Sequence, residues 1–385
     1  MSSSPEAKPA KPKKSVALSG VAAGNTALCT VGRTGNDLHY RGYDILDFAD
    51  EAEFEEIAYL LVHEKLPTRD ELSKYKQKLR GLRGLPAPLK TALEQLPKSA
   101  HPMDVLRTAV SALAAFDPEV ADTSPEATLR KGVRLTSQVP MIVAAHEHIR
   151  NGRAPVPPEP SLGHAANFLY MLKGKAPSAD AARLMDTDMI LHAEHGSNAS
   201  SFTARVVAGT EANLHAAVTA AIAALSGPAH GGAAENVMRM AQEIGDASKA
   251  GNYVRRKRAN KEPVMGFGHR VYRAEDPRAR HMRAGVERLS REMGQPHWYQ
   301  ILEALVEAMK PYARHGVNVN VDFYAGVVYF LNDIAEDLFV PIFAVGRVPG
   351  WTVQVLEQME NNILIRPLTL YSGPGPRAYL SIEKR

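Results

Sequence analysis

Cysteine is almost absent from this chain of 385 residues: Cys29 is the only one, so no internal disulfide can form. A lone thiol fits a reducing compartment. Uninterrupted apolar runs long enough to cross a bilayer are also missing, because acidic residues break the most apolar stretch, residues 327–345. The first fifteen residues lack the apolar centre of a signal peptide, and their three prolines oppose the helix of an organelle transit peptide. We therefore expect a disordered tail over residues 1–15 and a cytoplasmic protein.

Neither sign of charge is in large excess. The net charge is +4 at neutral pH, which suits small polyanionic ligands without requiring nucleic acid. Hydrophobic residues make up 45% of the chain, enough for a large core, and the length suggests two or three domains. Internal repeats are absent from the sequence.

Alternation of the β type is scarce, and we expect it only in residues 17–40 and in the C-terminal tail. Helical spacing of apolar residues dominates instead. The clearest predicted helices cover residues 54–61, 105–115, 185–192 and 302–309. A proline-rich connection between helices is expected over residues 153–160. The pattern predicts a mainly α protein.

The most informative segment is residues 264–278, which read VMGFGHRVYRAEDPR. Gly266 and Gly268 allow the backbone to approach a ligand closely. His269 is expected to titrate near neutral pH, and Arg278 offers a planar fork suited to a carboxylate. These residues indicate a site that binds an anion and transfers protons, although a basic surface loop without a function is the alternative.

A second histidine, His230, lies in GPAHGG at residues 227–232. The glycine and proline there should end a helix over residues 213–225, and a new helix should begin near residue 233. His230 is then expected in the elbow between two helices. Its alternative role is that of a histidine that only fills a turn.

Two further segments carry polar residues in apolar surroundings. Asp322 comes directly before an apolar helix expected over residues 323–331, so it is a candidate N-cap that the helix dipole would hold ionised. The segment LHAEHGSNAS, residues 191–200, adds His195 and several hydrogen-bond donors. A role as a helix cap alone would also explain why an aspartate is present at position 322.

In their order along the chain, these motifs resemble those of the citrate synthase family, which includes 2-methylcitrate synthases. The His195 segment is followed by GPAHGG, by GFGHRVY with DPR, and by NVDFY. Next come FAVGRVPGW at residues 343–351, IRP at 365–367 and YSGP at 371–374, while YRGYDI near the start is also similar to the family. The resemblance covers nearly the whole chain.

The resemblance implies a mainly α, two-domain helical fold with little β structure. A large helical domain would comprise residues 16–231 and 334–385. A smaller inserted helical domain, residues 232–333, would close over the substrates. Closure of this kind excludes water until both substrates are bound.

The resemblance also implies an acyltransferase reaction in which the acyl group becomes an alkyl group on transfer. Acetyl-CoA, oxaloacetate and water would give citrate and coenzyme A through an enol(ate) intermediate and citryl-CoA. A carboxylate is a weak base for a thioester methyl group, so the enolate oxygen needs a hydrogen-bond donor as charge develops. The family pattern makes Asp322 the base, His230 that donor, and His269 the acid that protonates the ketone oxygen.

For the two carboxylates of oxaloacetate, the family pattern implies Arg278, Arg347 and Arg366, with His195 assisting. Arg366 would come from the neighbouring subunit, which makes a homodimer the expected active unit. Neither a metal nor a separate cofactor is implied, since the coenzyme A thioester is a substrate.

For coenzyme A, the pattern implies that the backbone of Met265, Gly266, Phe267 and Gly268 runs along the adenine and that Arg273 meets phosphate. The basic residues of the segment 255–261 are a further candidate for its charged end. A solvated helix face is their alternative. The chain departs from the family at Ala234, where relatives have asparagine, which leaves the hydrogen bonding of His230 open.

Other classes of protein fit less well. The histidine pairs in residues 146–148 and 192–195 lack the spacing of a zincin helix. The GFG segment lacks the third glycine of a dinucleotide fold, and no recognisable nucleic-acid module is present. A non-catalytic regulatory or binding relative is the strongest rival, and the retention of His230, His269 and Asp322 argues against it.

Within the family, acetyl-CoA is the favoured substrate and propionyl-CoA, which would make the protein a 2-methylcitrate synthase, is the alternative. One methyl group in an apolar pocket changes specificity by only about 1–3 kcal/mol. Inhibition by NADH is not expected, because no extension for nucleotide regulation is visible.

Overall fold

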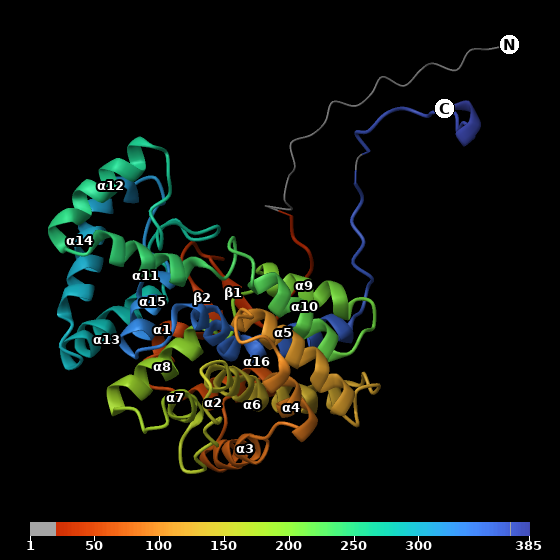
Figure 1. Ribbon diagram of the computed structural model, residues 1–385, viewed down its shortest axis with the longest axis horizontal. Coiled ribbons are helices and arrows are strands. Elements are labelled where there is room, and N and C mark those ends of the chain that lie inside the picture. The colour runs from red at the N-terminus through yellow and green to blue at the C-terminus, as the bar shows by residue number, and fades with distance from the viewer. Residues whose placement is uncertain (1–20, 370) are drawn as a thin grey trace. The chain divides into compact units, whose positions relative to one another are not determined.

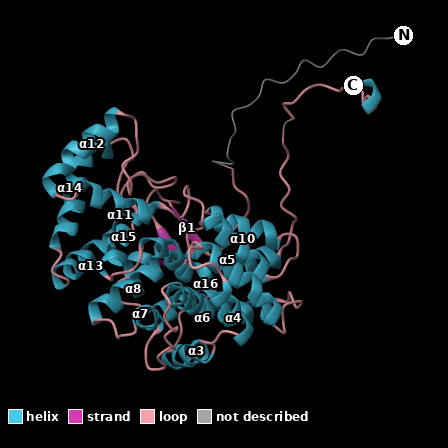
Figure 2. Cartoon of the chain, viewed as in Figure 1, coloured by secondary structure: helices cyan, strands magenta, loops and turns pink. Residues whose placement is uncertain are grey.

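The structure is a computed structural model and describes residues 21–369 and 371–385. The chain forms two units, one of Thr26–Ile363 and one that joins residues 21–25 with Leu364–Arg385. The described residues form 16 α-helices and three short strands (Figure 2). The prediction of a mainly α fold is confirmed, whereas the tail expected over residues 1–15 lies outside the described residues.

The first eight helices include the three predicted around residues 54–61, 105–115 and 185–192. Two of these, α2 and α8, extend beyond the predicted range, whereas α5 begins three residues earlier and ends two residues earlier than predicted. They are α1 (Ile45–Phe48), α2 (Phe54–His63), α3 (Arg69–Gly81), α4 (Ala87–Gln95), α5 (Pro102–Leu113), α6 (Pro125–Arg150), α7 (His164–Lys173) and α8 (Ala179–His192). The proline-rich residues 153–160 connect α6 to α7, as expected.

The other eight helices include those predicted at residues 213–225, 233 onward, 302–309 and 323–331. They are α9 (Ala199–Ala208), α10 (Leu214–Leu225), α11 (Ala233–Ile244), α12 (Ala250–Ala259), α13 (Ala279–Glu292), α14 (Pro296–Ala313), α15 (Asp322–Leu331) and α16 (Phe339–Glu360). Four single turns of 3-10 helix complete the set: η1 (Ala114–Phe116), η2 (Ala247–Lys249), η3 (Glu336–Leu338) and η4 (Ile382–Lys384).

Side-chain caps fix several helix starts near the site. Ser178, Asn198 and Asn213 accept hydrogen bonds from backbone N–H groups in the first turns of α8, α9 and α10, which satisfies donors that a helix leaves unpaired. Gly245 ends α11 with φ +66°, a left-handed conformation that favours glycine. Of these residues, Asn198 lies in the turn between α8 and α9, three residues after His195.

The strands form one small antiparallel sheet in the order β1 (Cys29–Val31), β2 (Leu38–Tyr40), β3 (Tyr43–Asp44). Cys29 pairs with Tyr40, and Tyr40 with Tyr43. Strands in the N-terminal region were expected, but those expected in the C-terminal tail were wrong: residues 364–369 and 371–385 contain none. The side chains of that segment alternate as in a strand, but its backbone pairs with no other strand.

Helix α16 is the centre of the unit Thr26–Ile363 and packs against α2, α6, α8, α9 and α10 (Figure 1). With the preceding turn η3, it is the one helix among the described residues that is long and apolar enough to cross a membrane. Nearly all of its apolar stretch is buried inside the protein, including Trp351 at 0% exposure. Burial of this kind marks α16 as a core helix.

Helices α11 to α15 lie together at one side of this unit (Figure 1). Helix α15 packs against α11 and α13, and α14 packs against α12 and α13. The grouping falls within residues 232–333, the range expected for the smaller domain. The division into residues 16–231 and 334–385 on one side and 232–333 on the other stays a prediction.

Candidate active site

Most of the candidate residues lie at helix ends of the unit Thr26–Ile363. His195 follows α8, His230 precedes α11, and Asp322 opens α15. The loop before α13 carries His269 and Arg278, whereas Arg347 comes from the middle of α16. Helix ends and the middle of α16 thus supply candidate side chains that are up to 152 positions apart in the sequence.

His195, His269 and Tyr272 form an aromatic cluster. The ring of His269 stacks on Tyr272 with centroids 4.6 Å apart, and the ring of His195 lies 5.3 Å from that of His269. His195 Nε2 is 3.2 Å from the Tyr272 hydroxyl. Burial, with the charge of Arg278 next in effect, holds the pKa of His195 well below its usual range.

His269 is neutral rather than poised near neutral pH, so that expectation was wrong. Burial and then the charge of Arg278 lower its pKa to about 4. Its Nδ1 accepts hydrogen bonds from the backbone N–H groups of Val271 and Tyr272, both at 3.1 Å. A neutral ring that accepts at Nδ1 carries its proton at Nε2. His269 is therefore a fixed hydrogen-bond donor through Nε2.

The loop of residues 265–268 is held against the start of α15. Phe267 pairs with Val319 in an isolated β-bridge, and the N–H of Gly268 donates to Asn318 O at 2.7 Å. Gly266 and Gly268 have φ values of +76° and +93°, and a Cβ at Gly266 would lie 2.6 Å from the Phe323 ring. Both conformation and space therefore require glycine at 266.

His230 is fixed by Ser200, at the start of α9. The backbone N–H of Ser200 donates to His230 Nε2 at 3.2 Å, and the Ser200 hydroxyl lies 2.9 Å from the same nitrogen. Trp351 Nε1 donates to that hydroxyl at 3.1 Å. Burial and Arg347 lower the His230 pKa to about 4. His230 is thus neutral with its proton on Nδ1, a second fixed donor.

Sequence reasoning missed Ser200 as the partner of His230 and Trp351 as the donor to the Ser200 hydroxyl. The only available signal was the presence of Ser200 among the polar residues of the segment 191–200. His230 Nε2 takes its hydrogen bonds from Ser200, so no side chain at position 234 is needed to fix that nitrogen. Ala234 is 5% exposed, and its carbonyl oxygen packs closely on Gly326 of α15.

Arg278 is buried and paired with Asp276. Its Nε donates to Asp276 Oδ1 at 3.0 Å and its Nη2 to Oδ2 at 2.7 Å, a two-point ion pair. The Asp276 carboxylate raises the Arg278 pKa against the effect of burial, and Arg278 lowers the pKa of Asp276 against the same effect. Arg278 is therefore held in one orientation. Its Nη1 is the guanidinium nitrogen that forms no hydrogen bond with Asp276.

Arg347 is 1% exposed and lies over the ring of Phe343, 4.6 Å from its centroid. Its Nε donates to the backbone oxygen of His192, and its buried Nη1 has no hydrogen-bond partner among the described residues. The pKa of Arg347 is lowered to about 10, mainly by burial; Glu194 opposes this effect and Arg278 adds to it. Two buried guanidiniums near one another suit a ligand with two negative charges.

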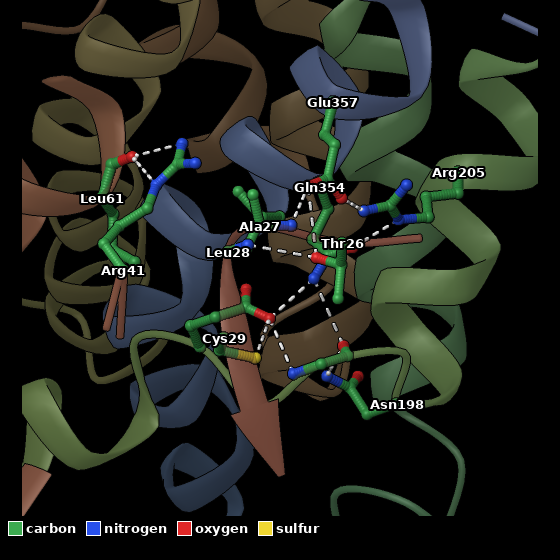
Figure 3. Close-up of polar contacts among 12 residues, drawn as sticks. Thr26, Ala27, Leu28, Cys29, Arg41, Leu61, Asn198, Arg205, Gln354 and Glu357 are labelled. Carbon is green, nitrogen blue, oxygen red and sulfur yellow. Dashed lines mark hydrogen bonds and ion pairs between the residues drawn. The ribbon is translucent and has the colours of Figure 1, made fainter. Parts of the chain in front are cut away.

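A polar network joins Cys29 and Gln354 to the loop that precedes Asn198 (Figure 3). The buried carboxylate of Glu194 accepts from the N–H of Gly196 at 2.7 Å and from Gln354 Nε2 at 2.6 Å. The Cys29 thiol lies 3.5 Å from the same oxygen. Burial raises the pKa of both Glu194 and the Cys29 thiol. The network ties β1 and α16 to the His195 loop.

Asp322 is the first residue of α15 and not its N-cap, which is Val321. The expectation of a capping aspartate with a depressed pKa was therefore wrong. Burial raises the pKa of Asp322, while His192 and Arg278 oppose that effect. Within the described part of the chain, no donor forms a hydrogen bond with its carboxylate. Such a carboxylate is a stronger base than one held by a cap.

The remaining candidates occupy exposed or partly exposed positions. Arg366 is exposed and lies in the unit that contains Leu364–Arg385. Arg273 is exposed, and its carbonyl oxygen accepts from Asn318 at 2.8 Å. In the basic segment 255–261, Arg256 and Lys257 pair with Glu243 and Glu262 on the surface, as on a solvated helix face. The described residues include no group of three or more His, Cys, Asp or Glu side chains placed to hold a metal ion.

Known proteins resemble the chain over nearly its whole length. The family described as "Citrate synthase, C-terminal domain" matches residues 17–368. "Citrate synthase 2" of Bacillus subtilis is 43% identical over 96% of this chain and 98% of its own. A "2-methylcitrate synthase" of Shewanella oneidensis is 41% identical over 98% of this chain and 99% of its own.

Among solved structures, the fold is similar to that of citrate synthase from Thermoplasma acidophilum in a ternary complex with carboxymethyl coenzyme A and oxaloacetate. The TM-score is 0.90 at 31% identity, covering 97% of this chain and 100% of the other. By its sequence and its fold, the chain belongs to the citrate synthase family.

Proposed function

We propose that the protein condenses acetyl-CoA with oxaloacetate and water to give citrate and coenzyme A. The observation that carries the proposal is the pair of neutral histidines, each with one nitrogen fixed as an acceptor. His230 is left with a donor at Nδ1 and His269 with a donor at Nε2. With the carboxylate of Asp322 as the base, this set supplies what enolisation and ketone attack require.

In the first step, Asp322 takes a proton from the thioester methyl group while His230 Nδ1–H donates to the thioester oxygen. The C–H electron pair moves into the enol(ate). Burial raises the pKa of Asp322, which reduces the difference between the pKa of this base and the pKa of the thioester methyl group. His230, whose pKa is about 4, donates as a neutral ring and does not lose its proton to solvent.

In the second step, the enol(ate) carbon attacks the ketone carbon of oxaloacetate, and His269 Nε2–H gives its proton to the ketone oxygen. Arg278 and Arg347 bind the carboxylates, and His195 adds a contact. Citryl-CoA then reacts with water, which breaks the thioester bond and releases coenzyme A as the thiol. The reaction uses these side chains without a metal or a further cofactor.

Coenzyme A binds along the backbone of residues 265–268, and Arg273 meets phosphate. Two observations support this placement. Gly268 is only half-buried and has open space beside its Cα, and Arg273 is exposed in the adjoining turn. Closure of residues 232–333 over the rest completes the site. The lone buried thiol of Cys29 fits work in the cytoplasm.

The active unit is a homodimer in which Arg366 serves the neighbouring subunit. The C-terminal segment supports this proposal, because Leu368, Tyr371 and Tyr379 are all more than 80% exposed. Exposed apolar side chains of this size mark a surface that binds protein.

Complementation between subunits tests the shared site. Arg366→Ala should weaken oxaloacetate binding, and so inactivate the homodimer at ordinary substrate concentrations. When it is coexpressed with Asp322→Asn on a separate tag, mixed dimers should contain one intact site each. Random mixing then restores about a quarter of wild-type activity. Failure of the purified mixed dimer to regain activity would show that Arg366 does not act across the interface.

Release of free coenzyme A thiol tests the function itself. Purified protein with oxaloacetate should give a higher kcat/KM for acetyl-CoA than for propionyl-CoA. The close relatives include both citrate and 2-methylcitrate synthases, so a propionyl-CoA preference would assign the second reaction. A protein that binds oxaloacetate but releases no thiol from either substrate would instead be a non-catalytic relative.

A further inference from the structure

Tyr272 has no part in the proposed reaction, although it is fully buried and contacts both His195 and His269. Its hydroxyl lies 3.2 Å from His195 Nε2, and the two ring centroids are 5.6 Å apart. Its backbone N–H donates to His269 Nδ1 at 3.1 Å, and its ring stacks on that of His269 at an interplanar angle of 23°. One residue therefore sets the surroundings of two site histidines.

The hydroxyl of Tyr272 has a single proton, and its partners decide where that proton lies. The hydroxyl donates to the backbone oxygen of Asp37 at 3.4 Å, and a carbonyl oxygen can only accept. The hydroxyl oxygen then offers only lone pairs to His195 Nε2, so this nitrogen must be the donor. Burial holds the pKa of His195 well below its usual range, so the ring is neutral and has one N–H. The proton of His195 is therefore on Nε2.

The backbone oxygen of Asp37 is held in place by the turn between β1 and β2. This oxygen also accepts from the N–H of Gly32 at 2.8 Å. The Asp37 carboxylate accepts from the hydroxyl of Thr30 at 2.7 Å and from that of Thr34 at 2.8 Å. Gly32 has φ +64°, a left-handed conformation that favours glycine. The hydrogen bonds of the turn thus give the acceptor of Tyr272 a fixed position.

The same turn contacts the chain on both sides of Tyr272. The side-chain amide of Asn36 donates to the backbone oxygen of Glu275 at 2.7 Å. A Cβ at Gly32 would lie 2.5 Å from Val271 Cγ1, so glycine allows the two segments to approach this closely. The loop that carries Tyr272 is therefore anchored to the turn at two further points, before and after the tyrosine.

We propose that Tyr272 is a positioning residue for oxaloacetate binding: its hydroxyl keeps the proton of His195 on Nε2, and its ring and backbone hold His269 in place. The inference rests on the proposed function, in which both histidines contact oxaloacetate. A neutral imidazole can carry its proton on either nitrogen, and only one of the two tautomers presents an N–H at Nε2. An N–H attracts an anionic ligand at that edge of the ring, whereas a lone pair repels it. Tyr272 acts through the histidines.

Tyr272→Phe removes the hydroxyl and keeps the ring over His269. The KM for oxaloacetate should rise about fivefold, the worth of one neutral hydrogen bond, because nothing then holds the proton of His195 on Nε2. The kcat should stay near the wild-type value, since the stack on His269 remains. A purely structural role for the hydroxyl would lower the free energy of unfolding and leave both constants of the folded enzyme unchanged. That result overturns the proposal.

Tyr324→Phe is the matched control. Tyr324 is 1% exposed, and its hydroxyl donates to Glu303 Oε1 at 3.2 Å, the same distance that separates the Tyr272 hydroxyl from His195. Its partner is a carboxylate on α14 and not a histidine of the site. The KM for oxaloacetate should therefore equal that of wild type. An equal rise in both variants would mean that the loss of any buried hydroxyl has this effect, and it would contradict the proposal.

The ring of Tyr272 is tested by a second substitution. Tyr272→Leu removes both the hydroxyl and the aromatic face, so His269 loses its stacking partner. In addition to the rise in KM, kcat should fall on the order of tenfold, because the N–H that protonates the ketone is displaced. A kcat equal to that of Tyr272→Phe would contradict the part of the proposal that concerns His269.

The tautomer of His195 can be measured in wild-type protein without turnover. With ¹⁵N-labelled histidine, His195 should show the nitrogen shifts of a neutral ring that carries its proton on Nε2. Its signals are assigned by their loss in His195→Gln. Thiol release by a protein whose His195 carries the proton on Nδ1 would overturn only this inference. Wild-type protein that has the expected tautomer but releases no coenzyme A thiol would overturn the proposed function and, with it, the role of Tyr272.

Discussion

Replacing Asp322 by asparagine is expected to abolish exchange of the thioester methyl protons while oxaloacetate binding remains. Asparagine has the shape of aspartate but cannot accept a proton at neutral pH. General base catalysis contributes about 10²–10⁴-fold, so kcat should fall by that factor. Folding should be preserved, because the Asp322 carboxylate makes no hydrogen bond that the amide would break, and it does not cap α15.

Two measurements separate the loss of the base from a loss of binding. Loss of the acetyl-CoA methyl signal in D₂O, followed by NMR with oxaloacetate present, reports proton removal, and calorimetry reports oxaloacetate affinity. Asp180→Asn, at an exposed position in the first turn of α8, is the control and should behave as wild type. Turnover at the wild-type rate in Asp322→Asn would remove Asp322 from the mechanism.

Replacing Gly350 by alanine is expected to destabilise the protein and to disrupt the site together. Gly350 lies in the middle of α16, where an added methyl group would overlap the carbonyl oxygen of Ala193 and lie 2.7 Å from Glu194 Oε2. Backbone atoms cannot rotate away as a side chain can. Overpacking of this kind costs on the order of 3 kcal/mol. The gain in helix propensity from glycine to alanine is only about 1 kcal/mol. The clash is larger, so the net effect of the substitution is to lower the free energy of unfolding.

The site is affected because Ala193 and Glu194 directly precede His195. Movement of that backbone should shift His195 and weaken oxaloacetate binding in the protein that still folds. Denaturant unfolding and calorimetry measure the two effects. The control is Gly81→Ala at the end of α3, where an added Cβ has no neighbour within 4 Å and φ is not positive. It should stabilise the protein by about 0.5 kcal/mol. Equal stability of the two variants would contradict the packing argument.

The helices could be predicted from the sequence because the sequence signals that define a helix are local. Apolar spacing, capping residues and prolines predicted α2, α5, α10 and α15 within about three residues of their observed ends. The predicted starts of α8 and α14 fall six residues inside the observed helices. The strands expected in the C-terminal tail failed for the opposite reason. A strand exists only if another strand pairs with it, and that partner is not encoded in the segment itself.

The candidate residues were named from motifs, but the chemistry of each one was not. His269 was expected to titrate near neutral pH, and Asp322 to be a cap with a depressed pKa. Burial reversed both, lowering the pKa of His269 to about 4 and raising that of Asp322. Burial belongs to the packed helices and has no signature in the few residues around an ionisable group.

Partners distant in sequence could not be found at all. Ser200 lies 30 residues from His230, and Tyr329 lies 141 residues from Asp188, yet these contacts fix a tautomer and hold a buried carboxylate. The sequence by itself determined the helical class, the order of the helices and the types of residue available for catalysis, because these depend on neighbours along the chain. Only the tertiary structure decided which nitrogen donates, which carboxylate is a base and which glycines admit no side chain, because packing sets burial, hydrogen-bond partners and free space.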